Sequence, residues 1–399
     1  MMKRAFKLAY LVSHPIQYQA PLLRYLSAQP DIELTVFFLS DLSTRPHIDH
    51  GFGAAVDWDV PLLDGYEHHF LPSLYPTDRL NFAEPVVRGL RQHLTGKGFD
   101  ALWVHGWYHQ ANLRAIRIAG SIDLPVMMRG ESLLHGSNWK QRFKGVIQRR
   151  VLESVDSFLS IGTRNREFYL HHGVPEERIF DVPYAVDNDF FRERASAASA
   201  TREEWRASLD LEPGRPVVLF ASKFIARKRP HDLLKAFIGL AQRGEEPLPY
   251  LLFAGDGSGR ESLQAEVDAS GLDSIRFLGF RNQTELPRLF DLCDVFVLPS
   301  AYEPWGLVVN EVMNAGRPVI TSDCVGAAPD LVLEGETGFT IPVGDTTLLA
   351  ARIHELLQGD CAKTMGAAAL RRISEWGFEQ DYQGIRAALE SRFSREVAA

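Results

Sequence analysis

The chain has 399 residues, of which 45% are hydrophobic and 24% are charged, and this length fits two domains of about 150–200 residues each better than one. Its formal net charge of −8 argues against a nucleic-acid-binding protein, and three scattered cysteines, Cys293, Cys324 and Cys361, argue against a disulfide framework or a zinc site. No apolar run approaches the roughly 18 residues that span a bilayer, so we expect a cytoplasmic protein.

Short apolar runs separated by helix-like stretches fill the first half of the chain. Such alternation of strands and helices predicts a parallel β-sheet. The first run follows Met1 and mimics a weak signal peptide, but its apolar part is short and Lys7 interrupts it, so we interpret it as the first strand. The strands predicted here are residues 7–13, 33–38, 101–105, 126–129 and 157–161.

Aromatic and imidazole side chains crowd residues 103–110, where the third of these strands ends. Aromatic faces with hydrogen-bonding neighbours suit a sugar, which has an apolar face and a polar rim. We predict a functional role for His105, which stands at the strand end, and a structural role for His109.

A second loop follows the next strand and carries Arg129 and Glu131. Arg129 could bind a phosphate or an anionic acceptor. It could equally form a salt bridge with Glu131 or with a nearby helix, and the sequence leaves both interpretations open. We include both residues among the candidate substrate-binding residues.

A basic, amphipathic stretch occupies residues 138–150. Its apolar residues recur at helical spacing and are expected to pack on the sheet, because every helix of such a fold buries one face. Its cations could lie on an anionic membrane surface or simply face solvent. Our hypothesis is that this stretch lies near the entrance used by an acceptor substrate and makes a peripheral contact with the inner face of the membrane. Such a contact would favour an acceptor that is lipid-linked or anionic.

Periodicity is lost between Asp187 and Gly214, so we place an interdomain linker there. The alternation of strands and helices then resumes. The predicted domains are residues 1–195 and 215–375, followed by a C-terminal helix within 376–399. The strands predicted in the second half are residues 217–221, 250–254, 275–278, 295–299 and 319–322.

Four cations stand among the nine residues 222–230, between a predicted strand and a predicted helix at 231–242. Lys223 and Lys228 belong to this loop. A basic loop at the carboxyl end of a parallel strand suits a diphosphate. Taken alone, the loop would equally fit a solvated surface.

Glu303 and Glu311 stand eight positions apart, around the start of a short predicted helix that ends near Gly316. The preceding strand ends where ligands bind in open α/β sheets, and free backbone N–H groups there favour phosphate. A carboxylate accepts hydrogen bonds only, so it suits the hydroxyl groups of a sugar. A site with N–H groups that donate to phosphate, beside carboxylates that accept from hydroxyl groups, would suit a nucleotide sugar.

These features resemble family 4 glycosyltransferases of the GT-B class. That family is marked by Glu-x7-Glu, by a basic loop of the type Gly-Arg-x5-Lys-Gly and by a Gly-Asp-Gly turn between them. Here Glu303 and Glu311 match the first motif, Lys223 and Lys228 take the usual arginine and lysine positions of the second, and residues 255–257 match the turn. The resemblance covers most of the chain and is strongest over residues 216–345. It implies an α/β fold of two Rossmann-like domains facing a cleft, with the last helix crossing back to the N-terminal, acceptor-binding domain.

The resemblance also implies site roles. Lys223, Lys228, Glu303 and His105 would serve catalysis, with both lysines stabilising the departing diphosphate. Glu311 would hold the ribose hydroxyls. The remaining donor-binding residues would be Gly306, Leu307, Val308, Gly255, Phe280 and Arg281, and further substrate contacts would come from Pro304 and Trp305.

The N-terminal loop departs from much of the family, which has a glycine pair after the first strand. This chain has His14-Pro15-Ile16-Gln17-Tyr18 and so resembles a bacterial subgroup with that sequence. We expect His14 and Gln17 to face substrate. Asp57 and Asp59 have the spacing of the metal motif of GT-A transferases, but their context argues against a metal site, and we expect none.

The function implied is retaining, metal-independent transfer of a sugar from a nucleotide-sugar donor to a glycan or lipid-linked saccharide acceptor. The setting implied is cell-surface polysaccharide or glycoconjugate biosynthesis, by a hexosyltransferase-type enzyme without a cofactor. The alternatives are a catalytically silent nucleotide-sugar-binding subunit, or a nucleotide-sugar epimerase on the same fold. A dehydrogenase is disfavoured because no Gly-x-Gly-x-x-Gly follows the first strand.

Overall fold

The computed structural model describes residues 4–49, 51, 53–75, 77–134, 148–244 and 247–398. The chain divides into two compact units. Unit 1 comprises Met1–Arg45, Pro61–Val186 and Gly377–Ala399, and unit 2 comprises Pro46–Val60 and Asp187–Trp376. All but the last three residues of the predicted basic stretch 138–150 lie outside the described residues. None of the described helices is long and apolar enough to cross a membrane.

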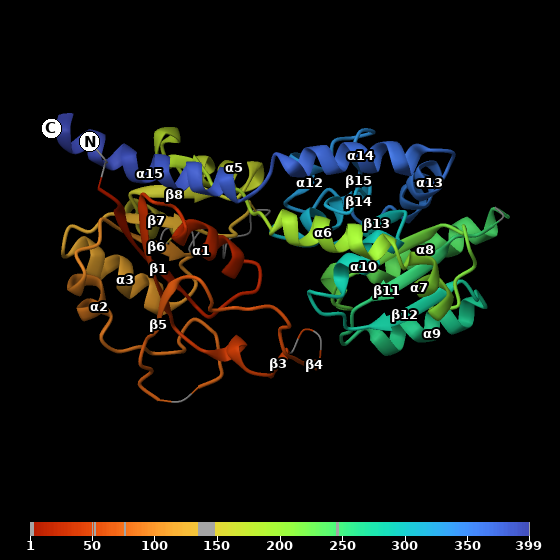
Figure 1. The fold of residues 1–399 in the computed structure, drawn as a ribbon, viewed down its shortest axis with the longest axis horizontal. Coiled ribbons are helices and arrows are strands. Elements are labelled where there is room, and N and C mark those ends of the chain that lie inside the picture. The colour runs from red at the N-terminus through yellow and green to blue at the C-terminus, as the bar shows by residue number, and fades with distance from the viewer. Residues whose placement is uncertain are drawn as a thin grey trace. The chain divides into compact units, whose positions relative to one another are not determined.

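Unit 1 is built on a seven-stranded parallel sheet in the order β5-β2-β1-β6-β7-β8-β9 (Figure 1). Both faces of β1 are buried: Leu8 and Tyr10 join one core cluster, and Ala9 and Leu11 join the other. A strand covered on both faces has a continuous apolar sequence, as β1 does. The elements are β1 Phe6–Val12, α1 Ala20–Ser27, β2 Ile32–Phe38, β5 Glu67–Phe70, α2 Leu90–Gly96, β6 Ala101–His105, α3 Gln110–Gly120, β7 Val126–Arg129, β8 Ser157–Ser160, α5 Thr163–His171 and β9 Ile179–Asp181.

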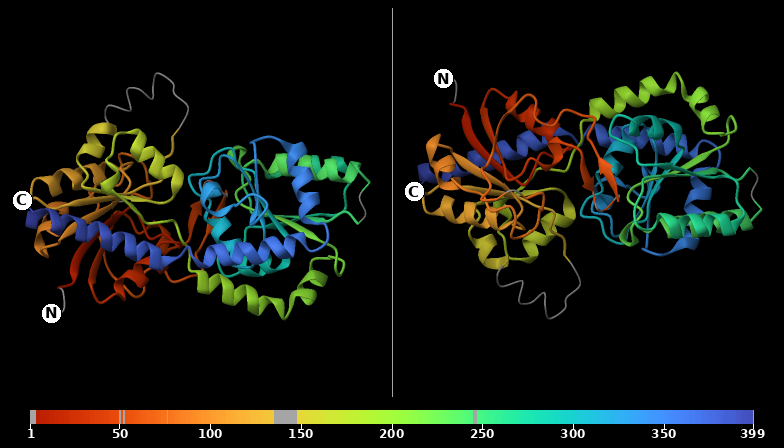
Figure 2. Two further views of the ribbon diagram at one scale, coloured as in Figure 1. Left: turned by 90° about the horizontal axis from the view of Figure 1, so that it is seen from above. Right: turned by 90° about the horizontal axis from the view of Figure 1, so that it is seen from below.

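The last helix of the chain, α15 (Phe378–Ala398), belongs to unit 1. It lies beside β8 and β9 and also contacts α1, and Figure 2 shows it, in blue, running along this unit. Ile385 and Leu389 bury their side chains in the same core cluster as Tyr10. The chain therefore completes the core of its first unit with its last helix.

Unit 2 is built on a six-stranded parallel sheet in the order β12-β11-β10-β13-β14-β15. Helices follow its strands, as expected for a parallel sheet. The elements are α6 Asn188–Ser199, α7 Arg202–Ser208, β10 Val217–Ala221, α8 Pro230–Gln242, β11 Tyr250–Ala254, α9 Arg260–Ser270, β12 Ile275–Gly279, α10 Leu286–Leu292, β13 Val295–Leu298, α11 Leu307–Met313, β14 Val319–Ser322, α12 Ala328–Leu331, β15 Gly338–Ile341, α13 Thr346–Leu356 and α14 Cys361–Ser374.

Two segments differ from the sequence-based expectation. The region expected to be a linker forms α6 and α7, and Asp187 begins α6 by accepting a hydrogen bond from Phe190 N at 3.0 Å. Phe191 is buried against α10, so this region is part of unit 2. The other segment is Pro46–Val60, which also belongs to unit 2 although its neighbours in sequence belong to unit 1. It contains an antiparallel pair, β3 His47–Asp49 and β4 Ala54–Val56.

Candidate functional site

The strand order of unit 2 has a switch point between β10 and β13. The chain runs from β10 to β11 and β12 on one side, and then crosses to β13 on the other. At such a point the loops after the two strands diverge, which is where ligands bind in open α/β sheets. The loops after β10 and β13 carry the predicted lysines and Glu303.

Lys228 and Glu303 form a buried ion pair across this switch point. Their side chains are only 11% and 12% exposed. Ala301 N donates to Arg227 O at 2.7 Å, so the two loops are also joined through their backbones. Burial lowers the pKa of Lys228, and the neighbouring carboxylate of Glu303 opposes that shift. The pair places a desolvated cation where a departing phosphate would develop charge.

Lys223, the other predicted lysine, is paired with Asp49. Its Nζ lies 2.8 and 2.9 Å from the two carboxylate oxygens. Asp49 also accepts a hydrogen bond from Gly51 N at 2.7 Å. Both residues belong to unit 2, because Asp49 is part of its Pro46–Val60 segment. Sequence analysis did not identify Asp49, which carries no motif and stands 174 positions from Lys223.

Three glycines after β11 pack against the backbone of the Lys223 loop. A Cβ on Gly255 would lie 2.0 Å from Ser222 O, and one on Gly257 or Gly259 would lie within 2.9 Å of the Phe224 backbone. The amide of Gly255 donates to Gly279 O at 2.8 Å. Gly255 therefore packs against the loop that carries Lys223, and its expected contact with the donor stays a prediction.

Glu311 is buried within α11. Gln283 Nε2 lies 3.4 Å from its Oε1, a long hydrogen bond. Burial raises the pKa of Glu311 to about 7, and the Gln283 contact only partly opposes the shift. A buried carboxylate so weakly satisfied can accept stronger hydrogen bonds from a ligand. Gln283 was not predicted from the sequence.

The loop after β12 carries Phe280 and Arg281. Arg281 Nη1 donates to Glu285 Oε1 at 2.9 Å, which fixes the arginine locally. Asp59 accepts from Thr284 N at 3.2 Å, and Asp57 accepts through its backbone oxygen from Asn282 Nδ2 at 2.5 Å. Both aspartates thus tie the Pro46–Val60 segment to this loop. Among the described residues there is no cluster of His, Cys, Asp and Glu suited to a metal ion.

Gly306 begins α11 with a φ of +98°, a conformation that favours glycine, and places the backbone of Leu307 and Val308 in the first turn. Pro304 O lies against Gly326, where a Cβ would approach it to 2.0 Å. Trp305 is 3% exposed, and its ring stacks on Trp376 with centroids 5.7 Å apart. Its Nε1 donates to Asn310 Oδ1 at 2.9 Å. Trp305 therefore packs within unit 2, and its expected contact with substrate stays a prediction.

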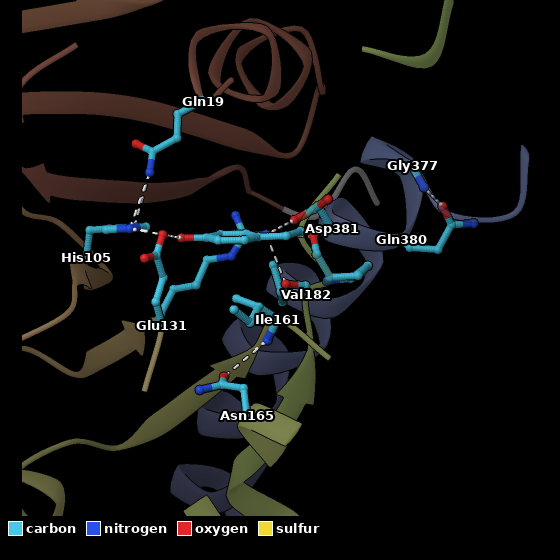
Figure 3. Close-up of polar contacts among 12 residues, drawn as sticks. Gln19, His105, Glu131, Ile161, Asn165, Val182, Gly377, Gln380 and Asp381 are labelled. Carbon is cyan, nitrogen blue, oxygen red and sulfur yellow. Dashed lines mark hydrogen bonds and ion pairs between the residues drawn. The ribbon is translucent and has the colours of Figure 1, made fainter. Parts of the chain in front are cut away.

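Unit 1 has a second switch point, between β1 and β6, and its predicted residues gather there. His105 ends β6. Its Nδ1 lies 3.0 Å from Tyr10 Oη on β1, and its Nε2 lies 3.3 Å from Tyr184 Oη beyond β9. Gln19 Nε2 approaches the same ring at 3.3 Å, as Figure 3 shows. Burial lowers the pKa of His105 to about 3, helped by the charge of Arg129, so the imidazole is neutral.

Glu131 continues this network. Tyr184 Oη donates to Glu131 Oε1 at 2.7 Å, and Tyr18 Oη approaches the same oxygen at 3.5 Å. The rings of Tyr18 and Tyr184 meet edge to face with centroids 5.8 Å apart. Glu131 is exposed, whereas Tyr184 is buried. Tyr184 was not predicted, although it stands just beyond a strand end where such residues gather.

Arg129 lies beside this network, with its guanidinium carbon 4.7 Å from the centroid of the Tyr184 ring, and its hydrogen bonds go to the core of unit 1. Its Nη2 donates to Asp381 Oδ1 on α15 at 2.7 Å, and to Val182 O and Pro183 O at 3.0 and 2.6 Å. Arg129 is 2% exposed and Asp381 is 0% exposed. This result corrects the expected contact of Arg129 with substrate: the salt bridge is the interpretation that holds, and its partner is the last helix.

His14 and Gln17 lie in the half-buried loop after β1, where His14 Nδ1 lies 2.8 Å from Ser13 Oγ. His109 Nδ1 contacts Asn81 O at 2.8 Å, which agrees with its predicted structural role. The predicted residues therefore form two groups, one at the switch point of each sheet.

Comparisons with known proteins identify the family. A family model described as glycosyl transferases group 1 matches residues 201–372, and one described as a glycosyl transferase 4-like domain matches residues 17–185. An alpha-D-kanosaminyltransferase of Streptomyces kanamyceticus is 31% identical over 212 residues, 53% of each chain, so the match spans about half the length of that relative. A D-inositol 3-phosphate glycosyltransferase of Mycobacterium marinum is 25% identical over 335 residues, 81% of this chain and 69% of the relative.

Solved structures share the fold. Sucrose-phosphate synthase from Thermosynechococcus elongatus has a TM-score of 0.70 at 20% identity, over 98% of this chain and 100% of that one. Alr3699/HepE of Anabaena, in complex with UDP and glucose, has a TM-score of 0.70 at 17% identity, over 97% and 100%. These results confirm the predicted two-domain α/β fold of the GT-B class.

Proposed function

The chain belongs to the group 1 glycosyl transferases, and from that premise we propose that it transfers a hexose from a nucleoside diphosphate sugar to a glycan or lipid-linked saccharide acceptor, with retention of configuration. We further propose that the reaction serves the synthesis of a cell-surface polysaccharide or glycoconjugate. UDP-sugars are the first donors to test, because UDP is bound in one neighbour of the same fold.

The observation that carries this proposal is the buried Lys228–Glu303 pair at the switch point of unit 2. When the bond between the anomeric carbon and the β-phosphate breaks, negative charge develops on the leaving diphosphate. A cation held in a desolvated position stabilises that charge without having to reorganise. Glu303 holds Lys228 in position, and as a carboxylate it can also accept hydrogen bonds from the hydroxyls of the transferred sugar.

Glu311 supplies the second element, the recognition of the nucleoside. Its carboxylate is buried, and within the part of the chain that the structure describes its side-chain hydrogen bond is the long contact with Gln283. The two ribose hydroxyls are donors that would satisfy it. The gain is greatest when Glu311 is ionised, because hydrogen bonds to a charged acceptor are about twice as strong as neutral ones.

We propose that the reaction needs no metal, because Lys223 and Lys228 can supply the positive charge that a divalent ion supplies elsewhere. In this mechanism Lys223 binds the diphosphate after exchanging its carboxylate partner Asp49 for phosphate oxygens. No enzyme nucleophile is assigned, and the departing phosphate accepts the proton of the acceptor hydroxyl.

The test is a panel of sugar nucleotides, with release of nucleoside diphosphate measured with and without candidate saccharide acceptors. Transfer predicts release that an acceptor accelerates and that Lys228→Ala slows by roughly 10²–10³. A silent binding subunit would bind a nucleotide without releasing product from any donor. An epimerase would interconvert sugar nucleotides without releasing diphosphate, which chromatography of the reaction mixture would detect.

A further inference from the structure

We propose that Glu131, Tyr184 and Tyr18 form a subsite in unit 1 that binds a hydroxyl group of an uncharged sugar acceptor and disfavours a phosphate or carboxylate at the same place. This inference rests on the proposed function, because it concerns the acceptor of that reaction. It adds the chemical class of the group that is recognised and the residues that recognise it.

The first argument is position. Tyr18 follows β1, His105 ends β6, Glu131 follows β7 and Tyr184 follows β9. All four strands are parallel, so these residues lie at one edge of the sheet, around the switch point between β1 and β6. Figure 3 shows Gln19, His105 and Glu131 converging there from different elements. This edge is the ligand-binding edge of an open α/β sheet.

The second argument is the direction of the hydrogen bonds. Tyr184 has one hydroxyl proton, and its contact at 2.7 Å with Glu131 Oε1 requires that this proton point to the carboxylate. The hydroxyl oxygen of Tyr184 can then only accept from His105 Nε2, 3.3 Å away. Tyr10 Oη donates to Gln19 Oε1 at 3.1 Å and lies 3.0 Å from Nδ1 of His105. In this series of hydrogen bonds, each donor polarises the next group toward Glu131. The network therefore holds the carboxylate in place.

The third argument is charge. Among the described residues, Arg129 is the cation whose field reaches Tyr184, but its Nη2 already donates to Asp381 and to two backbone carbonyls in the core. His105 is neutral. Neither Arg129 nor His105 therefore forms an ion pair with the carboxylate of Glu131. An anion bound at this place would be repelled, whereas a hydroxyl would donate a hydrogen bond.

The fourth argument is access. Glu131 is exposed, and its hydrogen bonds within the described residues use Oε1, so Oε2 can face an acceptor. The Tyr18 ring, half-buried and edge-on to Tyr184, offers an aromatic surface for the apolar face of a sugar ring. Ordered aromatic side chains beside one solvent-accessible carboxylate are the arrangement expected for a binding subsite.

The experiment measures binding in the absence of donor, by titrating full-length protein with methyl α-D-glucopyranoside, methyl α-D-mannopyranoside and D-glucose 6-phosphate while recording ligand-observed NMR. The wild type is expected to bind at least one of the two uncharged glycosides more tightly than the phosphate. Glu131→Ala should weaken that binding about tenfold to hundredfold, the loss of a charged hydrogen bond. Tyr184→Phe should weaken it less, because the carboxylate remains but is no longer oriented.

Two further variants make the result specific. Glu379→Gln is the matched control, because Glu379 accepts a hydrogen bond from Tyr25 Oη at 2.6 Å in the same unit, and it should bind like the wild type. Glu131→Lys, on an exposed side chain that should not disturb folding, should reverse the preference toward D-glucose 6-phosphate.

The inference is overturned if the wild type prefers the phosphate, if it binds none of the three probes, or if Glu131→Ala and Glu131→Lys leave the preference unchanged. Titration of the same variants with UDP monitors unit 2 separately. Failure of UDP binding and of donor turnover would count against the proposed function, whereas intact turnover with unchanged glycoside binding would count against this subsite alone.

Discussion

The ammonium group of Lys223 lies 2.8 and 2.9 Å from the two carboxylate oxygens of Asp49, so an intramolecular carboxylate takes the place expected for a diphosphate. Both side chains are about one quarter exposed, which limits the strength of the pair. Under the proposed mechanism, a donor would have to displace Asp49 before it could bind Lys223.

We expect Asp49→Asn to tighten UDP binding about twofold to fivefold, because a partly exposed ion pair contributes roughly 0.5–1 kcal/mol. Isothermal titration calorimetry measures the change. Glu334→Gln is the control, since it removes an ion pair in the same unit whose cation, Arg352, is 29% exposed against 28% for Lys223. Weaker binding by Asp49→Asn would mean that Asp49 supports the donor site and does not compete with the donor.

Lys228→Ala should lower kcat/KM by roughly 10²–10³, the range found when one preorganised donor to a developing anion is removed. The effect should be large because Lys228 is buried and Glu303 fixes its position. Release of nucleoside diphosphate is the measurement. Lys235→Ala, on the exposed face of α8, should leave the rate unchanged, and equal rates for both variants would remove Lys228 from the mechanism.

Glu311 should make donor binding depend on pH. Because burial raises its pKa to about 7, the carboxyl is protonated below that pH and accepts poorly, so affinity for UDP-glucose should increase as pH rises from about 6 to 8. Glu311→Gln should bind about 1.5–3 kcal/mol more weakly at pH 8 and lose the pH dependence. Calorimetry with the intact sugar nucleotide is suitable, because its diphosphate does not titrate in this range. A flat wild-type profile would contradict the prediction.

Transfer should continue in EDTA. If Lys223 and Lys228 neutralise the leaving group, a chelator should change kcat by less than about twofold. The assay should include Mg²⁺ and Mn²⁺ add-back. Loss of activity with EDTA and recovery with either ion would mean that a metal supplies this charge.

Asp381→Ala should destabilise unit 1 by about 3–5 kcal/mol, because it leaves the buried guanidinium of Arg129 without its carboxylate. Chemical unfolding followed by circular dichroism gives the change in the free energy of unfolding. The double variant Arg129→Met with Asp381→Leu should recover much of the loss, since it removes both charges. A loss below about 1 kcal/mol in the single variant would show that the pair adds little to the docking of α15.

Central strands were predictable because their apolar sequences are continuous. The predicted ranges of β6, β7, β10 and β11 agree with the observed ones, and each of these strands is buried or nearly so. The sequence analysis missed β5, β9 and β15, three of the four edge strands of the two large sheets, and predicted the fourth, β12, at residues 275–278. Edge strands are short and partly exposed, so they lack the apolar run that marks a central strand. The residues 67–70, Glu-His-His-Phe, illustrate this difference.

Site residues that belong to a known motif were predictable from the sequence. Contacts between residues far apart in the sequence were not. Lys228 and Glu303 were identified by spacing and resemblance, and the structure brings them into contact. Asp381 stands 252 positions from Arg129, and no sequence motif predicts that the two residues pair. Tertiary contacts of this kind follow from which strands become neighbours, which no local pattern specifies.

The stacked indoles of Trp305 and Trp376, 5.7 Å apart and inclined by 18°, give the Glu303 loop an optical signature of its own. Trp305 lies between Glu303 and Gly306, at the start of α11. Two indoles held at this separation couple their near-ultraviolet transitions, so their circular dichroism depends on the angle between the rings. Any rearrangement of the loop when nucleotide binds would alter that band, and occupancy could be followed in solution without a label or a coupled enzyme.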